Sequence, residues 1–238
     1  MTEVSVPSEV VGNVAEAQHI IRGDVSLETL RNWQNPDYII YAEEPNFSVV
    51  VLGEAHGDRE AGRKQLELIE LVHPQFVLDE FLSGWMYDPV SKSFQKQRGR
   101  TFDEFIDTDI RESCSINIPD IIEQSEKLGH TLVGCDLTFA EQDAVLEQLY
   151  DQDPSLRNYQ GIGLTGGSPQ VMPYRDKQMA KTIQEYAARA TKPVIVIMGA
   201  EHGNNLHEKG MIKQQGIHYA YVDQTPGYDR QQHLSTAT

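Results

Sequence analysis

The sequence predicts an α/β fold: a single domain with a mainly parallel central β-sheet flanked by helices, and a site at the C-terminal ends of the strands. Three observations predict it. Short apolar runs rich in β-branched residues indicate buried strands, and stretches with helical periodicity separate them. The length of 238 residues, without an internal repeat or a low-complexity tract, is compatible with one large α/β domain.

Five apolar runs are the strand candidates. Three are strong, because continuous runs rich in β-branched residues are typical of strands buried on both faces; they are Phe47–Leu52, Phe76–Leu78 and Pro193–Met198. Two weaker candidates are Thr131–Cys135 and His218–Val222. The helices are expected between these runs.

Four segments have the periodicity of amphipathic helices. They are Arg59–Val72, Ile118–Leu128, Ala140–Tyr150 and Tyr174–Arg189. The domain is expected to cover residues 16–223, and the polar or weakly patterned residues 1–15 and 224–238 are expected to be flexible termini.

The composition is that of an ordinary globular protein with an excess of acidic residues. Hydrophobic residues make up 39% and charged residues 24%. Because 20 Lys+Arg stand against 36 Asp+Glu, the formal charge is −16, and DNA or RNA would be repelled. The densest basic cluster is too short and mixed to override that field; it comprises Lys92, Lys96, Arg98 and Arg100. We therefore expect no nucleic-acid partner.

The sequence also favours a cytoplasmic protein that does not enter membranes. It contains no run of 18 apolar residues, and its N-terminus lacks the basic and apolar regions of a signal peptide. Cys114 and Cys135 have no CxxC spacing, so both are expected to be buried thiols rather than a disulfide or a metal pair.

Two of the strong strands end in the same pattern, which is a Gly, two residues, a His and a Gly. The first is Gly53–Gly57 (GEAHG) and the second is Gly199–Gly203 (GAEHG). Ligands bind outside the carboxyl ends of parallel strands, and a His there can act as a base, an acid or a metal ligand. Each His also has a nearby acid, Glu54 or Glu201. A lone His is more often structural, but the repetition of the whole pattern favours a functional site.

The remaining histidines lack this context and are expected to be structural or solvated; they are His19, His73, His130, His207, His218 and His233. The third strong strand ends at Asp79-Glu80. An acid at the end of an apolar strand is costly unless it is paired or solvated, so either residue is a candidate third member of the site. The structural alternative is a helix cap. Asp136, after Cys135, is a weaker candidate of the same kind.

With these motifs the chain resembles the TraB/TIKI superfamily, which also includes the haem-binding ChaN-like lipoproteins and the erythromycin esterases. The matching residues are Gly53–His56, Glu80, Arg175 in the RDKQMA segment, and Gly199–His202. The segment Leu52–Glu60 (LGEAHGDRE) is similar to the first conserved motif of the erythromycin esterases but is one residue shorter. The resemblance spans residues 47–206 and does not choose a branch of the superfamily.

The resemblance implies a hydrolase of ester or peptide bonds with a catalytic set of Glu54, His56, Glu80, Arg175 and His202. In a metal-dependent form, His56, Glu80 and His202 would hold Mn²⁺, Co²⁺ or Zn²⁺. Otherwise no cofactor is expected, and His56, oriented by Glu54 or Glu80, would activate water while Arg175 stabilises the oxyanion. Glu201 is a reserve candidate. Because the chain has no GxSxG elbow and no placed Cys nucleophile, a covalent acyl-enzyme is not expected.

Two alternatives stay open. The chain could be a non-catalytic binding protein for haem or a small molecule, as in ChaN-like relatives, or an inactive scaffold. The expected partner is a small-molecule or peptide substrate, and a homo-oligomeric state is left open.

A glycine-rich segment and a cluster of large apolar side chains lie outside these motifs. The GxGxxG match in Gly161–Gly167 follows polar residues rather than a strand, so a mobile loop leading to Arg175 is favoured over a nucleotide site. Trp85, Met86 and Tyr87 are equally compatible with a substrate cleft and with the core.

Overall fold

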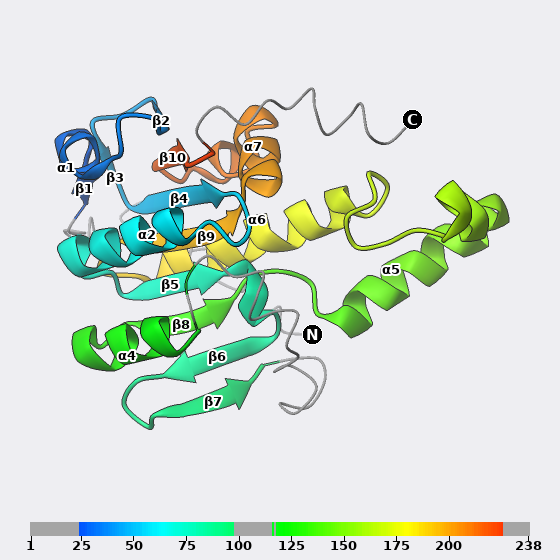
Figure 1. Cartoon of the computed structure of the whole chain (residues 1–238), viewed down its shortest axis with the longest axis horizontal. Coiled ribbons are helices and arrows are strands. Elements are labelled where there is room, and N and C mark those ends of the chain that lie inside the picture. The colour runs from blue at the N-terminus through cyan, green and yellow to red at the C-terminus, as the bar shows by residue number, and fades with distance from the viewer. Residues whose placement is uncertain (1–23, 98–115, 117, 226–238) are drawn as a thin grey trace, which may run out of the picture.

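The computed structural model describes residues 24–97, 116 and 118–225, which form a mixed α/β domain (Figure 1). Its centre is a sheet in the order β2-β10-β4-β9-β5-β8-β6-β7. The strands of this sheet are β2 (Ile39–Ala42), β4 (Val49–Glu54), β5 (Phe76–Asp79), β6 (Trp85–Asp88), β7 (Ser93–Lys96), β8 (Thr131–Gly134), β9 (Val194–Gly199) and β10 (Tyr219–Asp223). A separate antiparallel pair joins β1 (Val25–Ser26) to β3 (Asn46–Phe47).

The middle of the sheet is parallel, as the sequence predicts. Strands β10, β4, β9, β5 and β8 pair in parallel, and β2, β6 and β7 join antiparallel at the edges. Every residue of β4 and β9 is buried, which is why these strands have continuous apolar sequences. The predicted run Phe47–Leu52 is divided at Ser48 between β3 and β4. The edge strands β2, β6 and β7 were not predicted. The sequences of β6 and β7 mix polar and apolar residues, and β2 (IIYA) is a run of only four residues.

Helices cover both faces of the sheet (Figure 1). On one face, α1 (Leu27–Trp33), α2 (Arg59–Val72) and α4 (Ile118–Leu128) contribute to the same apolar cluster as Leu52 and Val77. On the other, α6 (Met172–Arg189) and α7 (Ala200–Glu208) share a second cluster with Val51 and Val196. The bounds of α2 and α4 are those predicted, and α6 begins two residues before the predicted Tyr174.

One helical segment lies apart from the sheet. The helix α5 (Phe139–Gln152) begins with a capping box between Thr138 and Glu141, and none of its residues is buried. With the short helix η3 (Pro154–Gly161) it projects beyond the end of the sheet, and the chain then returns through the glycine-rich segment to α6 (Figure 1). The remaining short helices are η1 (Glu80–Leu82) and η4 (Lys213–Gln215).

Cys135 is a buried thiol, as predicted, while Cys114, Arg98 and Arg100 lie outside the described residues. Trp85 and Tyr87 belong to the core rather than to a cleft.

Gln224, which was assigned to the C-terminal tail, is fully buried and accepts a hydrogen bond from Gln65. The other residues assigned to the flexible termini, 1–15 and 226–238, lie outside the described part of the chain. No helix within the described ranges is long and apolar enough to cross a membrane.

Candidate functional site

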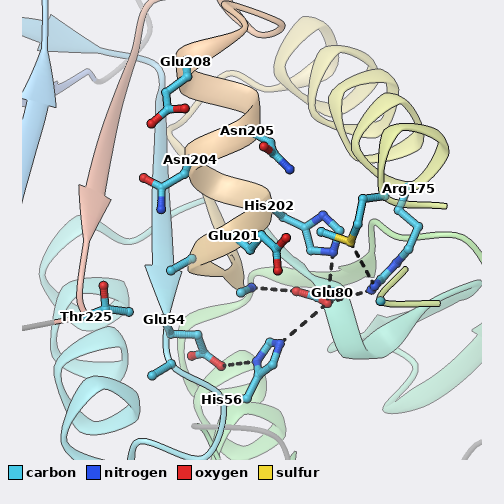
Figure 2. A pocket seen from close by; sticks show the side chains of 15 residues that line it. Glu54, His56, Glu80, Arg175, Glu201, His202, Asn204, Asn205, Glu208 and Thr225 are labelled. Atoms are coloured by element: carbon cyan, nitrogen blue, oxygen red, sulfur yellow. Dashed lines mark hydrogen bonds and ion pairs between the residues drawn. The ribbon is translucent and has the colours of Figure 1, made fainter. Parts of the chain in front are cut away.

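The strand order brings the two GxxH segments together. Strand β4 pairs with β9 so that Glu54 lies opposite Gly199, and β5 lies on the other side of β9. The three strand ends therefore meet at one edge of the sheet, where a pocket of about 830 Å³ opens (Figure 2). All the predicted catalytic residues line this pocket, together with the reserve candidate; they are Glu54, His56, Glu80, Arg175, Glu201 and His202.

Glu80 is the centre of the site. It is 5% exposed, and both of its carboxylate oxygens accept hydrogen bonds: Oε1 from Nη2 of Arg175 at 2.8 Å, and Oε2 from the backbone N–H of Gly199 at 2.6 Å. The Nε2 atoms of His56 and His202 lie 3.9 and 3.7 Å from Oε1 (Figure 2). Burial alone would raise the pKa of Glu80, but His202, His56, Arg175 and the Gly199 N–H together lower it.

His56 lies in a turn at the mouth of the pocket. The chain turns through Gly57, whose φ of 80° favours glycine, and Asp58 then caps α2 by accepting from the backbone N–H groups of Glu60 and Ala61. The side chain of His56 is 42% exposed, and its Nδ1 lies 3.5 Å from Oε1 of Glu54. Burial lowers the pKa of His56, but the hydrogen bond to Glu54 and the charges of Glu80 and Glu54 outweigh it, so the pKa is raised.

His202 has different surroundings. It lies in the first turn of α7, is 3% exposed, and places Nδ1 2.7 Å from Oδ1 of Asp176. Asp176 is completely buried, and sequence reasoning did not select it. The one signal that could have found it is its position next to Arg175 on α6.

Arg175 is bound by two carboxylates rather than free in the pocket. Its Nε donates to Oδ2 of Asp136 at 2.9 Å, and its Nη2 donates to both Asp136 and Glu80. Its Nη1 donates to the carbonyl of Gly166 at 3.3 Å, which ties the glycine-rich segment to the site. Asp136, a weak candidate from the sequence, is therefore part of the site; burial raises its pKa and Arg175 opposes that rise.

Two acids at the strand ends, Glu54 of β4 and Asp79 of β5, have further hydrogen-bond partners. Oε2 of Glu54 accepts from Nε2 of Gln65, which also donates to Oε1 of Gln224. Asp79 caps η1 by accepting from the Phe81 N–H at 2.7 Å, which is the structural role foreseen as its alternative. Burial raises the pKa of Asp79 to about 7.

Glycine is needed where the two segments touch. A Cβ on Gly199 would lie 2.8 Å from Nε2 of His56, so the second segment leaves room for the histidine of the first. A Cβ on Gly53 would lie 2.6 Å from the hydroxyl oxygen of Tyr221, and a Cβ on Gly203 would lie 2.6 Å from Cε2 of the same side chain. The glycines therefore permit close packing between β4, β9, β10 and α7.

The predicted metal ligands His56, Glu80 and His202 have carboxylate, guanidinium or backbone partners in this arrangement. Both oxygens of Glu80 already accept hydrogen bonds. In the described part of the chain, no group of three or more His, Cys, Asp or Glu side chains could hold a metal ion. Metal dependence by way of His56, Glu80 and His202 therefore stays a prediction for experiment.

No family model and no curated protein sequence matches the chain. Among solved structures, the chain is similar to ChaN of Campylobacter jejuni, which binds haem cofacially. The two share 13% sequence identity with a TM-score of 0.38, and the match covers 74% of this chain and 87% of that one.

Proposed function

We propose that this protein hydrolyses an ester or amide bond with a water molecule activated at the two histidines around Glu80. One observation carries the proposal: both Nε2 atoms face the same oxygen, Oε1 of Glu80, while each Nδ1 faces its own carboxylate. The gaps of 3.9 and 3.7 Å exceed direct hydrogen-bond lengths, so a water or a substrate atom could bridge them.

The reaction uses one histidine as a base and the other as an acid. A water gives its proton to one imidazole Nε2, its oxygen attacks the carbonyl carbon, and the π electrons move onto the carbonyl oxygen. When the tetrahedral intermediate collapses, the bond to the leaving group breaks and the other, protonated histidine supplies the proton. The positive end of the α7 dipole, at Ala200 in the pocket lining, favours the negative charge that develops.

Arg175 is better suited to positioning Glu80 than to the oxyanion role predicted from the sequence. Two carboxylates, Asp136 and Glu80, already compensate its charge. A guanidinium held on both sides keeps Glu80 ionised and oriented. The pocket of about 830 Å³ is in the range of small-molecule sites, which supports a small-molecule substrate or a short peptide segment.

A binding role remains the second candidate, because the side chain of His56 is 42% exposed at the pocket and could face a planar ligand such as haem. An iron ligand needs an unobstructed ring nitrogen. Both nitrogens of His56 face carboxylates, Glu54 at 3.5 Å and Glu80 at 3.9 Å, which favours acid–base work over iron ligation in this conformation.

The test compares the purified full-length chain with three variants on neutral p-nitrophenyl esters and a fluorogenic peptide panel. His56→Ala and His202→Ala are expected to lower the rate of hydrolysis. His73→Asn is the matched control, since His73 is exposed at the left-handed end of α2, a conformation that Asn tolerates. Equal rates in all four proteins, or no rate above buffer, would overturn the proposal.

Two further measurements separate the rival chemistries. A chelator should leave the rate unchanged if no metal takes part, and melting scans with Mn²⁺, Co²⁺ or Zn²⁺ should then show no specific stabilisation. Activity that disappears with chelation and returns with one metal would support the metal-dependent form. A haem titration that produces a stoichiometric Soret band abolished by His56→Ala, without hydrolysis, would support the binding role.

A further inference from the structure

The two histidines of the site differ in the group behind Nδ1. Asp176 lies 2.7 Å from Nδ1 of His202, and both residues are buried. Glu54 lies 3.5 Å from Nδ1 of His56, whose side chain is 42% exposed. A direct, buried hydrogen bond holds the first ring in one orientation, whereas the second ring has a longer contact and open solvent on one side.

We infer that Asp176 is a positioning residue that makes His202 the general base and leaves His56 as the proton donor to the leaving group. The inference rests on the proposed hydrolase function and assigns the roles within it. An ionised carboxylate can only accept, so the 2.7 Å contact places the proton of neutral His202 on Nδ1. Nε2 then carries the lone pair, and it faces Oε1 of Glu80 across 3.7 Å.

Helix α6 carries both Asp176, which positions His202, and Arg175, which holds Glu80. Arg175 and Asp176 are consecutive, so their side chains leave the helix about 100° apart. Arg175 reaches Glu80 and Asp136, while Asp176 reaches His202. A single helix therefore orients the carboxylate and one imidazole together, and α6 is itself packed on the sheet through Met179 and Ile183.

The buried Asp176 has a second partner at the surface. Nζ of Lys209, on a side chain that is 52% exposed, lies 3.4 Å from Oδ2 of Asp176. A buried carboxylate is costly unless it is paired, and this lysine supplies positive charge without entering the pocket. The negative charge of Asp176, the partner of His202, is therefore compensated by Lys209 at the protein surface.

In the resulting sequence of steps, Nε2 of His202 takes a proton from water and the oxygen of that water attacks the carbonyl carbon. His56, on the exposed side of the pocket, enters protonated and gives its proton to the leaving group. The proton gained by His202 then passes to solvent, and His56 is reprotonated from solvent, so the cycle closes without an added oxidant or cofactor.

The test combines ¹⁵N NMR of the histidine rings with kinetics on p-nitrophenyl butyrate. In the unmodified protein at a pH where His202 is neutral, its Nδ1 is expected to carry the proton, whereas His56 should show exchange between both tautomers. Asp176→Asn, which keeps the shape of the side chain, should lower kcat about 10²- to 10⁴-fold with little change in KM. Glu185→Gln, an exposed acid-to-amide change on the same helix, is the matched control.

A proton on Nε2 of neutral His202 in the unmodified protein would overturn the inference, and this measurement does not depend on the variant folding. So would full kcat in Asp176→Asn when His202→Ala is inactive. These results differ from failure of the proposed function itself, in which the unmodified protein hydrolyses nothing whichever tautomer His202 adopts.

Discussion

The two GxxH segments have the same sequence pattern and the same position after a strand, but they fold differently. After β4 the chain makes a turn through Gly57, and His56 stays at the mouth of the pocket. After β9 the chain enters α7 directly, and His202 is buried in the first turn. One motif therefore produces an exposed and a buried imidazole. The difference comes from the element packed against each one: α6 covers His202, while the ring of Phe81 contacts His56.

The comparison also shows that the two segments depend on each other. Gly199 of the second makes room for the ring of His56 of the first, and its N–H holds Glu80 between the two rings. Gly53 of the first and Gly203 of the second both pack on Tyr221. A substitution can therefore change one segment alone, or it can change Glu80, the carboxylate that both histidines face.

The largest effect is expected from removing the buried histidine. His202→Ala should lower kcat/KM by about 10³-fold or more, because it deletes the positioned base. His56→Ala should cost about 10- to 100-fold, since water has access to that side and can supply the proton. Steady-state kinetics of the two variants measures the difference, and an equal loss would contradict the unequal roles.

Glu80→Gln should destabilise the fold by about 3–5 kcal/mol near neutral pH, because it removes one partner of a buried ion pair. The pKa of Glu80 is lowered in the fold, so its stabilisation is present above the pKa of the unfolded chain and disappears as the pH falls through the folded pKa. Urea unfolding at pH 7 and pH 4 should therefore give a smaller difference at pH 4. A constant difference would contradict this pKa direction.

Asp79→Asn should stabilise the protein at alkaline pH, and it changes the carboxylate next to the shared Glu80 in the chain. The pKa of Asp79 rises from 3.8 to about 7 through burial, so ionising this group in the fold costs stability as the pH rises through that range. Above pH 7 the asparagine variant should be more stable by up to about 4 kcal/mol, and the advantage should vanish near pH 4.

The control for this change is Asp153→Asn. Asp153 caps η3 as Asp79 caps η1, but it is exposed, and hydrogen bonds from Ser155 lower its pKa. The control variant should gain no stability at any pH. If both variants are stabilised equally, burial of Asp79 is not the cause.

Gly199→Ala should cost about 1–3 kcal/mol, because the new methyl group would lie 2.8 Å from Nε2 of His56. In histidine NMR spectra the resonances of His56 should move more than those of His202. The control for stability is Gly167→Ala, where an added Cβ meets nothing within 4 Å. Similar unfolding free energies for the two variants would contradict the close approach.

The smallest effect concerns the exposed imidazole. The pKa of His56 is raised by Glu54 and Glu80 against the opposing effect of burial, so its contribution to stability is present at low pH and disappears as the pH rises through the folded pKa. His56→Gln should therefore lower the urea midpoint slightly at pH 5.5 and not at pH 8.5. Solvent screening keeps the effect small. A larger loss at pH 8.5 would reverse the assigned direction.

Much of the fold could be predicted because burial leaves a local signature in the sequence. The central strands are continuous apolar runs, and α2 and α4 have one apolar face, so their positions follow from periodicity. The helix α7 was missed because its AEHGNNLHE sequence has a weak apolar pattern and follows its strand without a loop. Its glycine and asparagines are also poor helix formers, so tertiary packing had to outweigh propensity.

The sequence by itself determined the two GxxH exits and the acid after β5, because each is a local pattern at a predictable strand end. The arginine of α6 was selected through the family resemblance alone. Only the tertiary structure decided that Asp176 lies behind His202, that Asp136 and Glu80 hold Arg175 from two sides, and that one histidine is buried and the other exposed. The physical reason is that a hydrogen bond between residues 26 or 39 positions apart depends on how helices dock on the sheet, and no local periodicity records that docking.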